Sequence, residues 1–243
     1  MRILIIRHGD PDYAIDSLTE KGKREAELLA LRLEKENIDK IYVSPLGRAR
    51  DTAEYTLRKK GMEATVCDWL QEFPIHIRRP EMPDGKKHCI WDWLPADWTV
   101  RENFYSAEKW TDEPEFKEAG VREEYDRVTK EFDKLLAAHG YVREGKYYRA
   151  ERSNSDTIAL FCHFGLECVL LGHLMSVSPM PLWHGFCAAP TSVTTIYTEE
   201  RRQGIASFRA ASLGDVSHLY AGGEEPAFSA RWCETFDRAD QRH

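Results

Sequence analysis

The sequence predicts an α/β fold built around a mostly parallel central sheet with one antiparallel strand. The apolar runs 3–6, 38–43 and 157–162 have the length and the β-branched content of buried strands. Helical patterns of apolar residues follow all three runs, the last of them reaching Met175. Strands that alternate with helices in this way indicate a parallel sheet.

Start signals place the helices of this pattern. Thr19 has the position of a helix N-cap, and apolar residues then recur at helical spacing at Ala26, Leu29, Ala30 and Leu33. Ser44 is expected to cap a second helix, with Pro45 in its first turn. A further helix is predicted from the apolar positions Val121, Tyr125, Val128, Phe132 and Leu136.

The second half of the chain adds antiparallel pairs. Residues 141–150, with Glu144 and Gly145 at their centre, have the pattern of a hairpin. The runs 193–197 and 205–213 are predicted to be the last two strands, paired antiparallel. No repeat or Ser/Gly-rich linker divides the 243 residues, so we expect one domain, 1–243, with an insert at 74–120 and a C-terminal tail at 220–243.

Composition and charge exclude several classes of function. The formal net charge of −7 disfavours binding to nucleic acid or to an anionic membrane. The first apolar run is too short for a signal peptide and no stretch approaches a spanning helix, so we expect a cytoplasmic protein. None of the six cysteines has an arginine six positions later, which disfavours a cysteine-based phosphatase, and their spacing disfavours a disulfide framework. The histidines show no metal-ligand spacing, so no metal is predicted.

The tripeptide Arg7-His8-Gly9 directly follows the first predicted strand. Open α/β sheets bind their ligands at the carboxyl ends of parallel strands, so this position indicates a site. Arginine supplies a fork of donors for a phosphoryl group, the imidazole can attack phosphorus, and glycine lets the backbone turn. A surface arginine beside a capping histidine is the alternative that these three residues leave open.

Two later segments agree with this reading. Arg48 lies near the start of the second helix, off its apolar stripe, where an arginine can reach an anion close to the positive end of the helix dipole. His163 ends the strand-like run that begins at Thr157, as His8 ends the first run. Two imidazoles therefore face one another if these strands are neighbours. Taken singly, an arginine in the position of Arg48 is more often solvated, and a histidine in the position of His163 is more often a hydrogen-bonded structural group.

Together, Arg7-His8-Gly9, the segment 44–53 (Ser-Pro-Leu-Gly-Arg-Ala-Arg-Asp-Thr-Ala) and His163 resemble the histidine phosphatase superfamily, the phosphoglycerate mutase-like group. Smaller agreements are the segments 18–22 and 215–219. The resemblance spans residues 1 to about 219 apart from the insert. It implies a three-layer α/β/α sandwich of the phosphoglycerate mutase type.

The resemblance also implies a chemistry. His8 is expected to become phosphohistidine, while Arg7, Arg48 and a protonated His163 surround the phosphoryl oxygens, with no metal or cofactor. The positive neighbours should disfavour protonation of His8 and keep its lone pair available. The expected partner is a small phosphorylated metabolite.

The family places a carboxylic acid in the loop after the third strand, to protonate the leaving alkoxide. Glu72 is the best match, because it follows the strand-like segment 64–67. Its neighbours Trp69 and Phe73 should raise the pKa of its carboxyl group towards neutrality. Asp10 and Asp12 are rival candidates, and a solvated glutamate is the alternative for Glu72 itself.

Departures from the family pattern favour simple hydrolysis. Mutases of this family usually carry glycine directly after the second histidine, where this chain has Phe164. The His-Asp pair of the acid phosphatase and phytase branch is absent. The alternatives are a mutase-type phosphotransferase, or a regulatory protein that binds a phosphorylated ligand with little turnover.

The insert 74–120 is the region expected to choose the substrate, as a cap or lid. Its prolines argue against one continuous helix. Its tryptophans, Trp91, Trp93, Trp98 and Trp110, are expected to fill a small satellite core rather than to stack on substrate. Its basic residues are expected to be solvated, with contact to a second anionic group of the substrate as the alternative for Arg78, Arg79, Lys86, Lys87 and Arg101.

Overall fold

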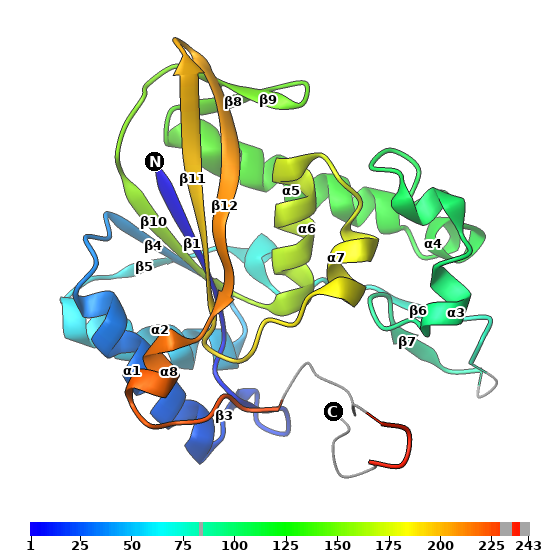
Figure 1. Cartoon of the computed structure of the whole chain (residues 1–243), viewed down its shortest axis with the longest axis horizontal. Helices are drawn as coiled ribbons and strands as arrows, with labels where there is room; N and C mark the ends of the chain where they lie inside the picture. The colour runs from blue at the N-terminus through cyan, green and yellow to red at the C-terminus, as the bar shows by residue number, and fades with distance from the viewer. Residues whose placement is uncertain (83–84, 229–234, 239–243) are drawn as a thin grey trace.

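The computed structural model describes residues 1–82, 85–228 and 235–238, and centres on a sheet of eight strands (Figure 1). These are β1 (Arg2–Arg7), β4 (Lys40–Val43), β5 (Ala64–Val66), β8 (Tyr141–Glu144), β9 (Tyr147–Ala150), β10 (Thr157–Cys162), β11 (Val193–Arg202) and β12 (Ile205–Asp215). Their order in the sheet is β5-β4-β10-β1-β11-β12-β9-β8. Two small hairpin sheets are formed by β2 (Pro11–Asp12) with β3 (Ser17–Leu18), and by β6 (His76–Arg78) with β7 (Lys87–Cys89).

The sheet is parallel in one half and antiparallel in the other. β5, β4, β10 and β1 pair in parallel, whereas β11, β12, β9 and β8 continue the sheet through antiparallel pairs. The α/β class is confirmed, and so are the hairpin at 141–150 and the two last strands. Two strands, β11 and β9, run opposite to β1, because the hairpin of β8 and β9 joins the edge of the sheet. The prediction of a single antiparallel strand is therefore wrong.

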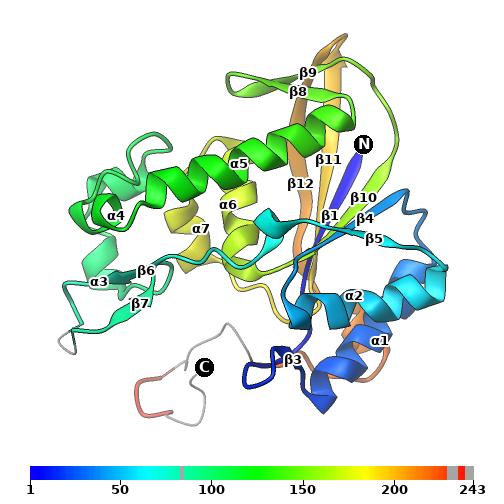
Figure 2. The same cartoon turned by 180° about the vertical axis from the view of Figure 1, so that it is seen from behind.

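Helices cover both faces of this sheet. They are α1 (Glu20–Glu34), α2 (Gly47–Lys60), α3 (Pro95–Trp98), α4 (Pro114–Glu118), α5 (Val121–Ala138), α6 (Phe164–Met175), α7 (Pro179–Gly185) and α8 (Ser217–Ala221). Figures 1 and 2 show α1, α2 and α8 on one face and α5, α6 and α7 on the other. The three layers implied by the family resemblance are therefore present.

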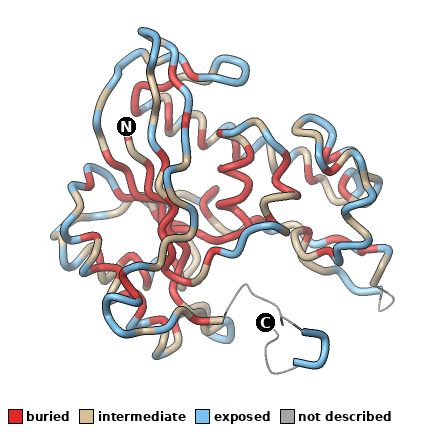
Figure 3. Tube along the Cα trace, in the orientation of Figure 1, coloured by how far each residue is buried: buried red, intermediate tan, exposed pale blue. Residues whose placement is uncertain are grey.

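Alternation along the central strands explains why their sequences read as unbroken apolar runs. Leu4 and Ile6 of β1 pack in the core beneath α1 and α2, while Ile3 and Ile5 pack in the core beneath α5 and α6. Successive side chains of a strand point to opposite faces, so a strand covered on both sides must be apolar throughout. Figure 3 shows the buried residues concentrated in these central strands and in α6.

The helix starts agree with the sequence in one case and differ in another. Thr19 caps α1 by accepting a hydrogen bond from the Gly22 amide at 3.0 Å, as predicted. Ser44 does not cap α2, which begins at Gly47 and has no side-chain cap. The hydroxyl of Ser44 is instead directed to His163, so a tertiary contact replaces the local one.

The insert 74–120 contains β6, β7, two short helices and the 3-10 turn Glu102–Tyr105, and no continuous helix, as expected. Trp93 and Trp110 are buried in the core beneath α5 and α6, which confirms the expected packing role for these two. The tail beyond α8 is described to Phe228 and again at 235–238, so Cys233 lies outside the described residues. Within those residues, no helix has the length and apolar content needed to cross a membrane.

Candidate active site

His8 and His163 lie side by side, because β1 and β10 pair in parallel and each histidine follows its strand. The register aligns Arg7 with Cys162, and the His8 amide donates to the Cys162 carbonyl at 3.0 Å. Their ring centroids are 5.0 Å apart, and both side chains are buried. The expected meeting of two imidazoles at neighbouring strand ends is confirmed.

His8 presents its Nε2 atom to Arg48. Its Nδ1 lies 2.7 Å from the Gly9 carbonyl oxygen, which can only accept, so Nδ1 carries the proton and the lone pair is on Nε2. The Arg48 Nε group donates towards this Nε2 at 3.4 Å. Burial lowers the pKa of His8 well below its ordinary value, and the charges of Arg7 and Arg48 lower it further. The imidazole is therefore neutral at pH 7, as predicted, with burial as the largest cause.

Backbone contacts fix the position of His8. The amide of Thr191, whose φ of +59° is unusual for a residue with a Cβ, donates to the His8 carbonyl at 3.1 Å. The Gly9 amide donates to the Thr52 hydroxyl at 2.9 Å, and that hydroxyl donates to the Arg48 carbonyl at 2.7 Å. Sequence reasoning assigned no role to Thr52 or Thr191. Thr52 belongs to the segment 44–53 on which the family resemblance rests, so a role for it could have been predicted from that motif. No local sequence pattern indicates a role for Thr191.

Two arginines bring positive charge to His8 from different elements. Arg7, the last residue of β1, is buried and donates from Nη1 to the Ala188 carbonyl at 2.6 Å. Arg48 is the second residue of α2, as expected near the helix start, and its side chain is 12% exposed. Its Nη1 pairs with Asp16 at 2.5 Å. Sequence reasoning missed Asp16.

His163 is held by Ser44. Its Nε2 lies 2.8 Å from the Ser44 hydroxyl, whose oxygen accepts a hydrogen bond from the Leu46 amide at 3.2 Å and whose proton can be donated to Nε2. Its Nδ1 is buried and has no hydrogen-bond partner among the described residues. Burial, followed by the nearby His8, Arg48 and Arg7, lowers the pKa of His163 well below its ordinary value. The expectation of a protonated His163 is therefore corrected, because a buried imidazole among positive groups stays neutral at pH 7.

The carboxylate of Glu72 lies at the start of α6, the helix that follows His163. Its Oε1 accepts the Phe73 and Leu166 amides at 2.8 and 3.0 Å, and its Oε2 accepts the Gly165 amide at 3.3 Å. Burial raises the pKa of Glu72 above its ordinary value, although these three amides oppose the shift. The direction agrees with the prediction from Trp69 and Phe73, both of which are buried.

Gly165 permits the carboxylate of Glu72 to lie close to the start of α6. A Cβ at that position would lie 2.6 Å from Glu72 Oε1 and 2.8 Å from the indole nitrogen of Trp91. Neither distance leaves room for a methyl group. Trp91, a residue of the insert, therefore lies against Gly165 as Glu72 does. Its ring packs edge to face with that of Phe164, with 6.3 Å between the ring centroids.

The rival acids Asp10 and Asp12 accept hydrogen bonds from residues of their own segment, 10–19. Asp10 Oδ2 accepts the Thr19 hydroxyl at 2.7 Å. Asp12 Oδ1 accepts the Ala14 amide at 3.0 Å, which is an Asx-type turn contact. Neither of these contacts involves His8, whereas the contacts of Glu72 tie it to the residues that follow His163.

Two arginines of the insert, Arg79 and Arg101, form ion pairs within the insert. Arg101 pairs with Glu113 at 2.9 Å and Glu115 at 3.2 Å, and its guanidinium lies 4.8 Å from the Trp93 ring centroid. Arg79 is buried and pairs with Glu81 at 3.3 Å. These contacts favour a structural role for both side chains.

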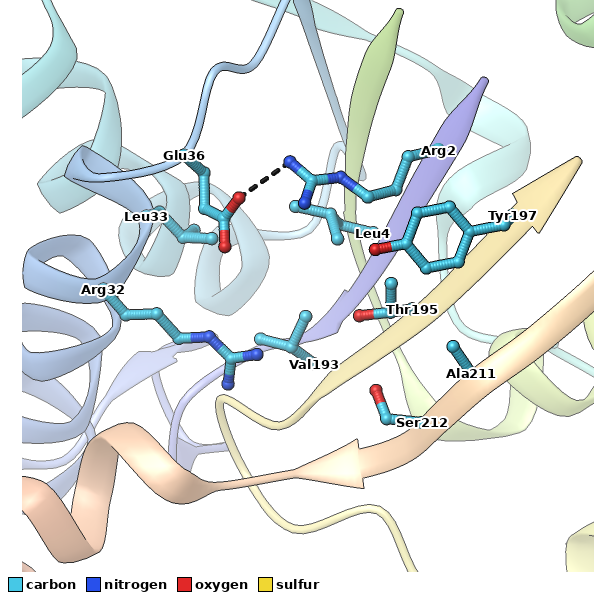
Figure 4. Close-up of a pocket in the computed structure, with 10 residues that line it drawn as sticks. All are labelled: Arg2, Leu4, Arg32, Leu33, Glu36, Val193, Thr195, Tyr197, Ala211 and Ser212. Carbon is cyan, nitrogen blue, oxygen red and sulfur yellow. Dashed lines mark hydrogen bonds and ion pairs between the residues drawn. The ribbon is translucent and has the colours of Figure 1, made fainter. Parts of the chain in front are cut away.

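A cavity of about 240 Å³ lies elsewhere, between α1 and the strands β1, β11 and β12 (Figure 4). Its two arginines are paired, Arg2 with Glu36 at 2.7 Å and Arg32 with Asp215 at 2.8 Å. None of the predicted site residues lines it. Across the described residues, no three His, Cys, Asp or Glu side chains are grouped so that they could hold a metal ion.

Comparisons with known proteins agree with this geometry. The model of the Histidine phosphatase superfamily (branch 1) matches residues 3–210. Phosphoserine phosphatase 1 of Hydrogenobacter thermophilus is 25% identical over 222 residues, covering 84% of this chain and 90% of its own. A phosphoserine phosphatase variant from Entamoeba histolytica in complex with phosphoserine has a TM-score of 0.54 at 19% identity, covering 90% of this chain and 98% of its own. A mycobacterial glucosyl-3-phosphoglycerate phosphatase has a TM-score of 0.58 at 20% identity, covering 88% and 98%.

Proposed function

Because the chain belongs to the histidine phosphatase superfamily (branch 1), we propose that it is a metal-independent phosphomonoester hydrolase that forms a phosphohistidine on His8. The observation that carries this proposal is the state of His8. Its Nδ1–H is bound to the Gly9 carbonyl, and its Nε2 lone pair faces the Arg48 guanidinium. A neutral imidazole fixed in one tautomer beside a positive group has the properties of a nucleophile for a phosphate ester.

The phosphoryl group is bound by the positive and donor groups around His8. Arg7 and Arg48 neutralise its charge from β1 and α2. The neutral His163 contributes a hydrogen bond: with Ser44 donating to Nε2, the proton of the ring is on Nδ1, which has no other described partner. These donors stabilise the charge on the equatorial oxygens of a loose transition state.

The reaction proceeds in two displacements. In the first, His8 Nε2 attacks phosphorus, the N–P bond forms, the P–O ester bond breaks, and the leaving oxygen takes a proton from Glu72. In the second, water attacks phosphorus and gives a proton to the Glu72 carboxylate, the N–P bond breaks, and orthophosphate leaves. Glu72 Oε2 is suited to carry the proton, since its one backbone contact is the longest of the three.

The substrate is proposed to be a small phosphorylated metabolite. The named relatives and structural neighbours are phosphatases of such compounds, among them phosphoserine phosphatases. We expect Trp91 to be the residue of the insert that contacts the leaving group, because it lies near Glu72 at Gly165. We propose that the rest of the insert supports this wall rather than binding a second anion, since Arg79 and Arg101 are paired within it.

The test is hydrolysis of sugar phosphates, nucleotides and phosphorylated acids in EDTA, with His8→Ala and Glu72→Ala as matched variants. We expect turnover by the wild type without added metal, none by His8→Ala, and slowed turnover by Glu72→Ala. Transfer of phosphate to a second metabolite in place of water would identify a mutase-type phosphotransferase. Orthophosphate binding without turnover of any compound would identify a regulatory binding protein and overturn the proposal.

A further inference from the structure

We propose that Asp16 is a positioning residue that holds the guanidinium of Arg48 in the orientation its contact with phosphate requires. The inference rests on the proposed function, in which Arg48 binds the phosphoryl group. Asp16 lies on the hairpin of β2 and β3, 32 residues before Arg48, and its carboxylate contacts the first turn of α2.

Asp16 binds the start of α2 through both carboxylate oxygens. Oδ2 accepts the Gly47 amide at 2.7 Å, and Oδ1 accepts Arg48 Nη1 at 2.5 Å. A carboxylate is favoured here by the unpaired amides and the positive dipole of a helix N-terminus. Burial acts to raise the pKa of Asp16, but the Gly47 amide and the Arg48 guanidinium outweigh it and hold that pKa below its ordinary value. Asp16 is therefore ionised at pH 7.

The backbone of the hairpin is built for this approach. Asp16 has a φ of +49°, a left-handed conformation that costs energy for a residue with a Cβ. A Cβ on Gly47 would lie 2.0 Å from the Asp16 carbonyl oxygen, so only glycine allows the hairpin to lie this close to α2. Strain on one side of the contact and an obligatory glycine on the other show that the pairing is specified by the fold.

The pairing leaves the useful edge of Arg48 facing the site. A guanidinium offers a side fork formed by Nε and Nη2, and Asp16 occupies only Nη1. The Nε group points to His8 Nε2 at 3.4 Å, so the side fork is directed to the place where phosphorus must arrive. Tyr13, on the same hairpin, adds a second restraint, because the Arg48 guanidinium carbon lies 5.4 Å from its ring centroid.

The pair is expected to act on orientation more than on stability. The Asp16 side chain is 43% exposed, and an ion pair with one such partner adds little to the free energy of unfolding. Arg48 has several rotatable bonds, however, and a displacement of about 1 Å in a positioned group can cost about a hundredfold in rate. The loss of Asp16 should therefore weaken phosphate binding and catalysis without unfolding the protein.

The chain offers a matched control. Asp51, one turn further along α2, accepts a hydrogen bond from the Ser17 hydroxyl and so also ties the hairpin to α2. This contact involves neither Arg48 nor His8. Asp51→Ala removes one hydrogen bond between these two elements and Asp16→Ala removes two, but only Asp16→Ala removes a partner of the Arg48 side chain.

The experiment measures orthophosphate binding by calorimetry in the His8→Ala background, so that it does not depend on turnover. We expect Asp16→Ala to weaken orthophosphate binding about tenfold or more, and Asp51→Ala to change it by less than about twofold. Asp16→Asn, which keeps an acceptor for the Gly47 amide, should give an intermediate loss. In an Arg48→Ala background, Asp16→Ala should have no further effect beyond about twofold, because the two side chains act as a unit.

Three results would overturn the inference. Equal losses in Asp16→Ala and Asp51→Ala would show that the hairpin matters only as a structural element. Additive losses in Asp16→Ala and Arg48→Ala would show that the two residues act separately, and tighter binding in Asp16→Ala would show that the carboxylate competes with phosphate. Melting temperatures of all variants identify any unfolding, in which case Asp16→Asn carries the test. Tight orthophosphate binding with no hydrolysis by the wild type would refute the proposed function but leave the role of Asp16 measurable.

Discussion

Arg48 and Arg101 are both arginines with largely buried side chains, 12% and 21% exposed, yet their surroundings differ. Arg48 pairs with one carboxylate through Nη1 and directs Nε at His8. Arg101 pairs with two carboxylates, Glu113 and Glu115, and lies over an aromatic ring. The comparison teaches that burial and charge do not by themselves identify an anion-binding arginine. What separates the two is whether a donor edge remains directed at a reactive group.

The largest expected difference follows from this comparison. Arg48→Ala should lower kcat/KM by about a hundredfold or more, because a preorganised charged donor is lost from the transition state. Arg101→Ala should leave kcat/KM within a few-fold but lower the free energy of unfolding by about 2 kcal/mol, because two carboxylates lose their partner. Steady-state kinetics and urea denaturation of both variants check this. The comparison fails if Arg101→Ala lowers kcat/KM as much as Arg48→Ala without loss of stability.

The position of Glu72 provides the next test. Gly165→Ala should lower kcat by about tenfold to a hundredfold, because the added methyl group would displace the carboxylate or the Trp91 indole. Gly185→Ala is the control, since a Cβ there meets nothing within 4 Å. Stopped assays with an alkyl phosphate ester measure both. If the two alanine variants behave alike, the close approach at Gly165 has no part in catalysis.

The protonation of Glu72 predicts how the rate depends on pH and on the leaving group. Its pKa is raised and the proposed first displacement uses its acid form, so kcat/KM for alkyl phosphates should fall as the pH rises through that pKa. The pKa values of His8 and His163 are lowered well below 6.5, so titration of these imidazoles should cause no loss of kcat/KM as the pH falls through 6.5, and the remaining change should follow the second pKa of the substrate phosphate, which is about 6. Glu72→Gln should lower kcat/KM, which reports the first displacement, far more for alkyl phosphates than for p-nitrophenyl phosphate, whose leaving group needs no proton. A comparable loss of kcat/KM for both substrates would argue against Glu72 as the proton donor.

The smallest effect is expected at Glu167, a second buried acid on α6. Burial raises its pKa to about 7, with Thr194 as its hydrogen-bonding partner. Between about pH 4.5 and 7, the folded protein therefore keeps a proton on Glu167 that the unfolded chain has released. The free energy of unfolding thus falls as the pH rises through this range, by about 3 kcal/mol at most. Glu167→Gln should raise the melting temperature at pH 8 and change it little at pH 4.5. Equal shifts at both values would show that ionisation of Glu167 is not involved.

Much of the candidate site at the carboxyl ends of β1 and β10 could be predicted from the sequence, because the signals for it are local. Apolar runs fixed the positions of β1 and β10, and the rule that parallel strands present ligands at their carboxyl ends placed His8 beside His163. Apolar neighbours correctly indicated the direction of the shift in the pKa of Glu72. In each case a property of a few adjacent residues was sufficient.

Other features depend on contacts between segments that are distant in the sequence, and no local sequence pattern predicted these contacts. Ser44 before Pro45 has the pattern of a helix cap, but its hydroxyl binds His163, 119 residues away. The charge of His163 was mispredicted because burial, which removes the proton, follows from tertiary packing. Asp16 reaches Arg48 only because the hairpin folds over α2 at Gly47.

Formation of a phosphohistidine is tested most directly by trapping the enzyme during turnover of a phosphate-labelled substrate and locating the label by mass spectrometry. We expect a phosphoryl group on Nε2 of His8 that forms and is discharged fast enough to explain turnover, and that is absent from His8→Ala. A label on another side chain, or turnover with no phosphorylated protein at a time resolution that should reveal it, would show that His8 is not the nucleophile.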